Sequence, residues 1–269
     1  MNWIGIDHQL DHTAIAILEG GARAPVLVAD DEFSEIPNAV RGIAWGSAAL
    51  GGTEPVPCSL RLNDPDAWER SGAPAFWAGI RGRISQFLGG IDFARDGRFE
   101  LVFTGPETDR GEGRPALDSA AQLLGTETYT AIPATDALLA QWLVGEPSGE
   151  ARIVAAAVTG ADCTELAVWA VENRGRSAPA CRLRGRESVP VGDGAVRARL
   201  LDEVLRHTDR RSIPADARLA WIARSEMELF AMRLESASPG ENIEWTGALR
   251  RSFHSRPLLQ RSRIEAWEE

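Results

Sequence analysis

Two stretches of this chain repeat one pattern, in which an apolar run is followed by a polar turn and a second apolar run. The segments are 2–6, 7–12 and 13–18 in the first copy, and 153–158, 159–162 and 163–171 in the second. Runs of small and β-branched residues on both sides of a turn favour a buried hairpin. One such hairpin in each half of the chain predicts an internally duplicated fold, with the functional site between the two copies.

The composition is that of an ordinary globular protein of 269 residues, with 44% hydrophobic and 25% charged residues. No apolar run approaches the ~20 residues of a membrane span, and the N-terminus has no signal-peptide pattern. We therefore expect a cytoplasmic protein that does not contact a membrane. Cys58, Cys163 and Cys181 form no paired framework and no C-x-x-C motif, which favours buried thiols in a reducing compartment.

The formal net charge of −10 argues against a nucleic acid partner, because a polyanion is repelled at long range. The arginines of 174–186 are expected on a solvated hairpin. Every basic residue is an arginine, and the chain contains no lysine.

The first half, residues 1–145, reads as a strand meander followed by alternating helices and strands. Strands are expected at 3–6, 13–18, 25–29, 99–104 and 127–132. Helices are expected at 75–88, 115–124 and 134–144, with Thr135 as the N-cap of the last. Prolines and glycines after residue 30 indicate an inserted lobe that extends to about residue 97.

The second half, residues 146–269, follows the linker 145–150 and repeats this order. The expected elements are strands at 152–158, 163–171 and 180–186, a helix at 195–207, a strand at 218–223, a helix opened by the capping box 225–228, a strand at 242–245 and a helix at 246–259. Each half therefore predicts a mixed α/β sheet with helices on its faces.

This order of elements resembles the actin-like ATPase superfamily, most closely the nucleotide-binding domain of DnaK-type chaperones. The motifs that carry the resemblance are Trp3–Asp7, Ile36–Val40, Trp45–Ala49, Phe103–Pro106 with Arg114, Thr130–Leu138 and Thr164–Val168. They are spread over nearly the whole chain and stand in the family's order. The resemblance implies a duplicated ribonuclease-H-like fold, in which two mixed sheets carry flanking helices and a small inserted lobe.

The residues that would hold ATP in that family are largely missing. The two phosphate turns of the family are glycine-rich, because only residues without a bulky Cβ let backbone N–H groups approach an anion closely. The first turn here has no glycine, and the second keeps Gly160 and places Val158 or Ala157 where a metal-holding aspartate is expected. Leu50 stands at the family's lysine and Ile132 at its glutamate. The segment 208–216 is too short for the lobe that covers adenine.

These losses predict a degenerate nucleotide cleft without a catalytic residue. The cleft positions are Asp7, His8, Gln9, Asp11, His12, Thr13, Thr159, Gly160, Ala161, Asp162, Thr164 and Gly192. Phosphoryl transfer depends on positioning and on stabilisation by metal and cation, so the absence of these groups argues against hydrolysis. No cofactor is expected; binding of ATP and magnesium without hydrolysis stays as an alternative.

A metal site is the second alternative. Asp7, His8, Asp11 and His12 combine two carboxylates and two imidazoles, a ligand set for Zn²⁺ that would support hydrolytic chemistry. The competing interpretation is a polar hairpin turn whose aspartates bind backbone N–H groups. Side chains alternate between the two faces of a strand, so all four would converge only in a special turn geometry.

The remaining interpretation is a pseudo-ATPase that acts as a protein-binding scaffold, a subunit or an accessory chaperone-like partner. Its partner would be an intact relative or an enzyme that it stabilises, and the chain itself is a candidate for oligomer formation. Large aromatic side chains anchor many interfaces, which makes Trp45, Trp68 and Trp77 candidates for the partner surface.

Overall fold

The computed structural model describes most of the first 206 residues and a few short segments beyond them. The described residues are 2–9, 12–22, 24–31, 33, 35–41, 43–50, 56–57, 72–105, 114–145, 152–160, 163–172, 180–206, 227, 230, 233–234, 237–238, 241–244 and 258–260. Two compact units divide the chain, one of Met1–Ala48 and Val56–Gly192 and the other of Ala49–Pro55 and Asp193–Glu269. Each unit is described by itself.

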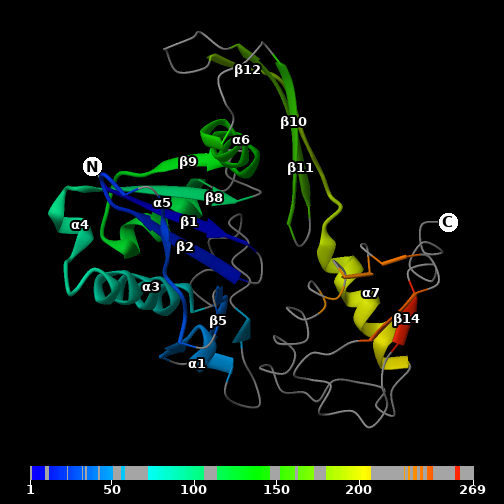
Figure 1. Ribbon diagram of the computed structural model, residues 1–269. Helices are drawn as coiled ribbons and strands as arrows, with labels where there is room; N and C mark the ends of the chain where they lie inside the picture. Colours follow the sequence, from blue (N-terminus) through cyan, green and yellow to red (C-terminus); the bar gives the residue numbers. More distant parts are fainter. Residues whose placement is uncertain are drawn as a thin grey trace. The chain divides into compact units, whose positions relative to one another are not determined.

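The first unit contains a mixed sheet with the strand order β3-β2-β1-β8-β9 (Figure 1). Its strands are β1 (Asn2–His8), β2 (His12–Leu18), β3 (Val26–Leu27), β8 (Phe99–Gly105) and β9 (Thr130–Pro133), and β4 (Ile36–Pro37) also pairs with β2. β1 and β2 form an antiparallel hairpin, β8 runs parallel to β1, and β9 runs parallel to β8. The meander followed by parallel strands confirms the element order expected for this part of the chain.

Alternation of side chains decides which face of this sheet is buried. Ile4 and Ile6 of β1 lie opposite Ile17 and Ile15 of β2, and all four are buried. The residues between them, such as Gly5, point to the other face, because successive strand residues alternate. Burying a side chain of this size contributes about 1.5–3 kcal/mol, so the register of the hairpin is strongly determined.

Helix α3 (Ala73–Phe87) packs in the core beneath this face, together with α5 (Arg114–Leu124). Its buried residues Phe76, Trp77, Ile80 and Ile84 follow helical spacing. The helix expected at 75–88 is therefore confirmed. α4 (Phe93–Asp96) is a single turn that places Phe93 in the same core.

Only part of the expected inserted lobe forms a sheet of its own. β5 (Ala39–Arg41) pairs with β6 (Ala44–Trp45) on one side and with β7 (Val56–Pro57) on the other, and α1 (Ser47–Leu50) follows β6. Helix α3 instead belongs to the main core, because its apolar stripe packs with Ile4 and Ile6. Of the residues expected in the lobe, 30–97, those of α3 thus pack in the main core.

The second sheet of this unit is antiparallel, in the order β10 (Arg152–Thr159), β11 (Thr164–Glu172), β12 (Ala180–Val189). All three expected strands are confirmed. Helix α6 (Ala134–Gly145) covers one face, where Leu139 packs with Ala167, Trp169 and Val171. The other face carries exposed apolar side chains, of which Ile153 is the most open at 69%.

The larger segment of the second unit begins with α7 (Asp193–Arg206), which confirms the helix expected at 195–207. Met227, Phe230 and Leu234 follow with helical spacing and are buried. β13 (Asn242–Glu244) pairs with β14 (Leu258–Gln260) in an antiparallel hairpin. The helix expected at 246–259 is therefore wrong at its end, since Leu258 and Leu259 belong to a strand whose partner is distant in sequence.

The division between the units falls at Gly192, whereas the sequence suggested a boundary near Gly145. β10–β12 group with the first unit because α6, the last helix of the first half, packs directly on them. Residues 146–150 of the expected linker 145–150 lie outside the described residues, as do the strand at 218–223 and all of the capping box 225–228 except Met227.

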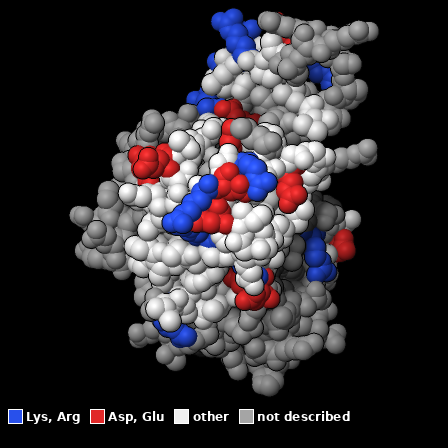
Figure 2. Space-filling view, turned by 90° about the vertical axis from the view of Figure 1, so that its left-hand side faces the viewer, with Lys and Arg blue, Asp and Glu red and all other residues white. Residues whose placement is uncertain are grey.

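The described part of the chain is thus a mixed α/β protein with a mixed sheet and flanking helices, as expected. None of its described helices has both the length and the apolar character needed to cross a membrane. On the face shown in Figure 2, arginine and carboxylate side chains are interspersed. Arginine–carboxylate ion pairs near α4 include Arg81–Asp92 and Arg98–Asp96.

Candidate functional site

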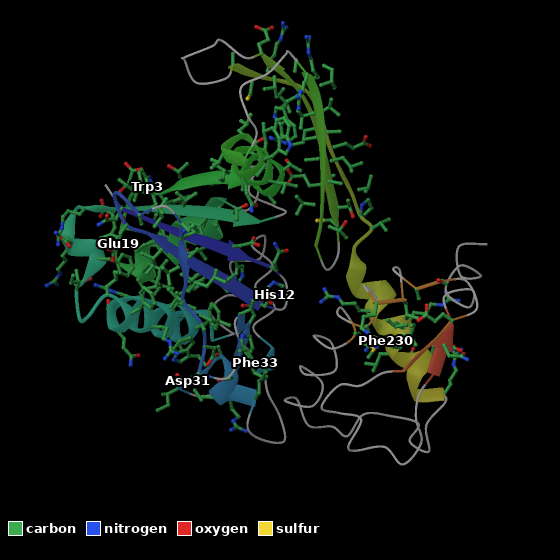
Figure 3. The ribbon with its side chains drawn as sticks, viewed as in Figure 1. Trp3, His12, Glu19, Asp31, Phe33 and Phe230 are labelled. Carbon is green, nitrogen blue, oxygen red and sulfur yellow. The ribbon has the colours of Figure 1, made fainter. Side chains whose placement is uncertain are left out.

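The turn between β1 and β2 lies at the end of the first sheet where the parallel strands β1 and β8 finish. The N–H of Gln9 donates to the carbonyl of His12 at 2.9 Å and closes the turn. In Figure 3, His12 marks this end of the hairpin, while Trp3 and Glu19 mark the opposite end. Open α/β sheets bind ligands beyond the carboxyl ends of their strands, so this turn is the candidate site.

On the inner face of the turn, His8, Thr13 and Asn38 form a buried chain of hydrogen bonds. Thr13 Oγ1 donates to Asn38 Oδ1 at 2.7 Å and lies 2.7 Å from His8 Nδ1. A hydroxyl has one proton, so Thr13 must accept the second bond and His8 must carry its proton on Nδ1. The lone pair of His8 Nε2 then points into the core, where that atom has no hydrogen-bond partner among the described residues.

Asn38 holds the turn to the following lobe. Its Nδ2 group donates to the carbonyl of Gln9 at 2.7 Å and to that of His12 at 3.2 Å. Asn38 therefore bridges both strands of the hairpin from a position 26–29 residues further along the chain. Asn38 belongs to a motif that carries the family resemblance, but the sequence analysis gave it no role. The feature that could have indicated this role is its position as the one amide side chain in a run of apolar residues and proline.

Aromatic rings surround His8. Its ring centroid lies 5.2 Å from that of Trp77 and 6.3 Å from that of Phe76. Burial, with a smaller contribution from the nearby His12, lowers the pKa of His8 to about 3. His8 is therefore neutral near pH 7, and its role in the described structure is to support the turn.

The outer face of the same turn gathers a different set of polar groups. Asp7 lies opposite Thr104 of β8 in the parallel register, and Gln9 Nε2 donates to Asp7 Oδ1 at 2.9 Å. His12 Nε2 lies 3.6 Å from Glu35 Oε2. Burial raises the pKa of Asp7, against the opposing effects of the Gln9 hydrogen bond and of His12, while Glu35 adds to the increase.

The second turn, between β10 and β11, has the same construction as the first. The N–H of Gly160 donates to the carbonyl of Cys163 at 2.8 Å, as Gln9 does to His12. The flanking pairs His8–Thr13 and Thr159–Thr164 occupy equal places in the two registers. Counting back from these pairs places Val158, and not Ala157, at the position of Asp7.

The hydroxyl of Thr164 ties this hairpin to the segment after β12. It donates to the carbonyl of Val191 at 2.6 Å and lies 3.2 Å from Thr159 Oγ1. Gly192, the next residue, is buried. Thr13 and Thr164 thus make equivalent contacts, each to the chain that follows its own meander. Ala161 and Asp162 lie outside the described residues, as do Leu10 and Asp11.

A buried carboxylate that the sequence did not single out connects α6 to the second sheet. Glu165 of β11 accepts hydrogen bonds from the hydroxyl and the N–H of Thr135, and Arg186 of β12 lies 3.6 Å from it and pairs with Asp136. Thr135 is the second residue of α6 and is not its N-cap. Its hydroxyl donates a hydrogen bond to Glu165, which is 30 residues further along the chain. The sequence around Thr135 does not indicate this distant partner.

The described residues do not fit a cradle for the phosphates of ATP. The N–H groups of Gln9 and Gly160 are both used within their own turns, and Thr13 is fully engaged by His8 and Asn38. Val158 offers no oxygen where the resemblance places an aspartate. The four residues considered as a metal site also point in different directions: His8 points into the core, whereas its neighbour Asp7 points to the opposite face of the sheet. Within the described residues, no group of three or more His, Cys, Asp or Glu is arranged to hold an ion.

The tryptophans named as partner candidates occupy different environments. Trp77 is fully buried at the centre of the core, so its indole fills the interior and is not available to a partner. Trp45 is partly buried, packed against α3 with its ring 6.4 Å from that of Phe76. Trp68 lies outside the described residues. Ile43, between β5 and β6, is 95% exposed, and its sequence neighbourhood does not distinguish it from other aliphatic residues.

No protein-family model and no curated protein matches this chain. The relationship to actin-like ATPases therefore depends on the motifs and hairpin geometry described above, and it stays a prediction.

Proposed function

We propose that this protein is a catalytically degenerate relative of the actin-like ATPases, similar to DnaK-type nucleotide-binding domains, that acts by binding another protein. The observation that carries this proposal is the closure of both hairpin turns on themselves. Gln9 and Gly160 direct their N–H groups to the carbonyls of His12 and Cys163 and not outward to a ligand. A triphosphate needs such donors to be free at the turns that hold it.

The equal construction of the two hairpins also supports a duplicated fold. In the first sheet, β1 is flanked by the antiparallel β2 and the parallel β8. In the second, β10 has β11 on one side, and its sequence between Ile153 and Thr159 contains no charged residue. Edge strands are commonly protected by charges, so an uncharged edge favours a further strand there.

The proposed partner surface is the tip of the β5–β6 hairpin. Ile43 is 95% exposed there, next to Trp45, whose ring anchors the hairpin on α3. A fully exposed aliphatic side chain on an anchored hairpin fits a partner with an apolar pocket. The partner would be an intact relative or an enzyme that this protein stabilises, in the cytoplasm.

Exchange of Ile43 for serine tests this surface. We expect Ile43→Ser to weaken the complex by about 10-fold or more, the effect typical of a central interface anchor. Val144→Ser is the matched control, because Val144 is an aliphatic side chain that is 89% exposed on α6. The complex is captured with tagged protein from its own cells, identified by mass spectrometry, and its affinity is measured with the purified partner.

Two results would contradict the proposal. If Ile43→Ser and Val144→Ser bind the partner with unchanged affinity, the hairpin tip is not the surface. Calorimetry with ATP and Mg²⁺ tests the loss of nucleotide binding: a dissociation constant below ~10 μM, about −7 kcal/mol, would mean that the cleft still works as a nucleotide site.

A further inference from the structure

The outer face at the end of β1 gathers oxygen atoms of three described side chains. Gln9 Oε1 and Thr104 Oγ1 are both buried, and neither has a hydrogen-bond partner among the described residues. Asp7 joins them, since Gln9, the residue after the end of β1, donates to its carboxylate and Thr104 is its register partner on β8. Three neighbouring side chains thus present oxygen atoms at this end of the sheet.

The charge around these atoms is negative. Asp7 supplies one carboxylate and Glu35 a second, and His12 beside Glu35 is the titratable group that opposes them. Gln9 donates to Asp7 Oδ1, and the other lone pairs of the carboxylate stay available as acceptors. An ammonium group matches this arrangement, because its three N–H donors diverge from a single atom and meet three separate acceptors.

We propose that Asp7, Gln9 and Thr104 form a binding site for a primary ammonium group. The ammonium would donate one hydrogen bond to the Asp7 carboxylate, one to Gln9 Oε1 and one to Thr104 Oγ1. This cation site would lie at the end of the sheet where the resemblance to actin-like ATPases implies a phosphate site. It does not depend on the proposed partner surface at Ile43.

No side chain of this sequence supplies a primary ammonium group, because it contains no lysine. The two possible sources are a small free amine and a lysine side chain of a bound protein, and both present the same chemistry.

Titration with small ammonium salts tests the site in the full-length protein. The probes are propylammonium chloride, for a free amine, and Nα-acetyl-lysine methylamide, for a lysine in a polypeptide. Tetramethylammonium chloride carries the same charge without an N–H donor and serves as the control. We expect saturable shifts of Asp7, Gln9 and Thr104 amide signals in NMR spectra with both probes, and none with tetramethylammonium at equal ionic strength. Tighter binding of the lysine derivative would identify a protein as the source, and equal or weaker binding would identify a small amine.

Two variants locate the binding. Asp7→Asn keeps the size of the side chain and removes its charge, and we expect it to weaken binding at least ~10-fold, because a hydrogen bond to a charged group is lost. Thr104→Val removes one acceptor and should weaken binding by about 3–10-fold. Glu100→Gln is the control on the same strand, at an exposed position, and should leave binding unchanged.

The inference is overturned by any of three results. The first is the absence of a saturable shift with either probe up to ~50 mM, a concentration above the millimolar range expected of a single weak site. The second is equal binding of tetramethylammonium. The third is unchanged binding by Asp7→Asn whose fold is shown to be intact by circular dichroism. A high-resolution crystal structure with ordered water on all three oxygens in the presence of propylammonium would also overturn it.

Discussion

His8 is the residue whose position and chemistry are most tightly determined. It is 3% exposed, donates to Thr13 through Nδ1, and contacts the rings of Phe76 and Trp77. Burial removes the water that would stabilise a charged imidazolium and, with a smaller contribution from the nearby His12, lowers the pKa of His8 to about 3. A histidine that looks like a metal ligand in the sequence is thus a neutral hydrogen-bond donor in the fold.

The depressed pKa of His8 predicts how stability depends on pH. An unfolded histidine titrates near 6.5, and folded His8 near 3, so the unfolded state binds more protons between these values. The contribution of His8 to stability is complete above pH 6.5 and is lost as the pH falls toward 3, by up to about 1.4 kcal/mol per pH unit. Asp7, whose pKa is raised, acts in the opposite direction above its usual value.

Urea unfolding of the native protein and of His8→Leu at several pH values between 7 and 4 measures this effect. The variant cannot titrate at this position, so we expect its free energy of unfolding to fall less steeply with acidification. Taking the difference between the two proteins removes the contribution of Asp7 and of other groups common to both. Parallel curves would show that His8 is not the buried neutral histidine described above.

Helix α3 is predicted by the spacing of its apolar residues, but the environment of each residue in it depends on the elements packed against the helix. The apolar spacing of Phe76, Ile80 and Ile84 predicts the helix and its buried side. The spacing does not explain the two glycines in its middle. A Cβ at Gly79 would lie 2.3 Å from the Trp45 ring, whereas a Cβ at Gly82 would meet nothing within 4 Å.

Replacement of each glycine by alanine separates helix propensity from packing. Gly82→Ala should stabilise the protein by about 0.5–1 kcal/mol, because alanine favours a helix over glycine. Gly79→Ala has the same propensity gain but must displace Trp45, and we expect a net loss of about 1–3 kcal/mol. Thermal unfolding measures both changes, and tryptophan fluorescence reports the displaced ring. An equal gain in stability for both variants would contradict the contact with Trp45.

At the scale of the whole molecule, the boundary between the two compact units is determined by which elements pack together, and it does not lie at the midpoint of the chain. The expected linker lies just after α6, yet Leu139, Trp142 and Leu143 of α6 pack against β10 and β11. Separating the chain there would expose this cluster to water, whereas the division at Gly192 leaves it intact.

Two fragments distinguish these boundaries. A fragment of residues 1–192 is expected to unfold cooperatively with native-like tryptophan fluorescence, since both apolar cores described above lie within it. A fragment of residues 1–145 lacks the strands that cover α6 and should bind a hydrophobic dye and unfold at lower temperature. Circular dichroism and dye fluorescence measure the difference. If the shorter fragment were equally stable and bound no dye, the boundary at Gly145 would be correct.

The sequence by itself determined the local structure of this protein. Alternation of apolar residues gives β1, β2 and β10–β12, and helical spacing gives α3, α5, α6 and α7, because these periodicities follow from backbone geometry alone. The repeated turn pattern also indicated where polar groups gather, at the ends of the two hairpins.

Only the tertiary structure decided what those polar groups do. The chain His8–Thr13–Asn38, the bonds from Thr135 and Arg186 to Glu165, and the juxtaposition of Asp7 with Thr104 each join residues from different elements. Trp77 became a core residue and Leu258 a strand residue for the same reason. Spacing along one segment determines which side of that segment is apolar, but the atom that a side chain meets there depends on how distant segments pack.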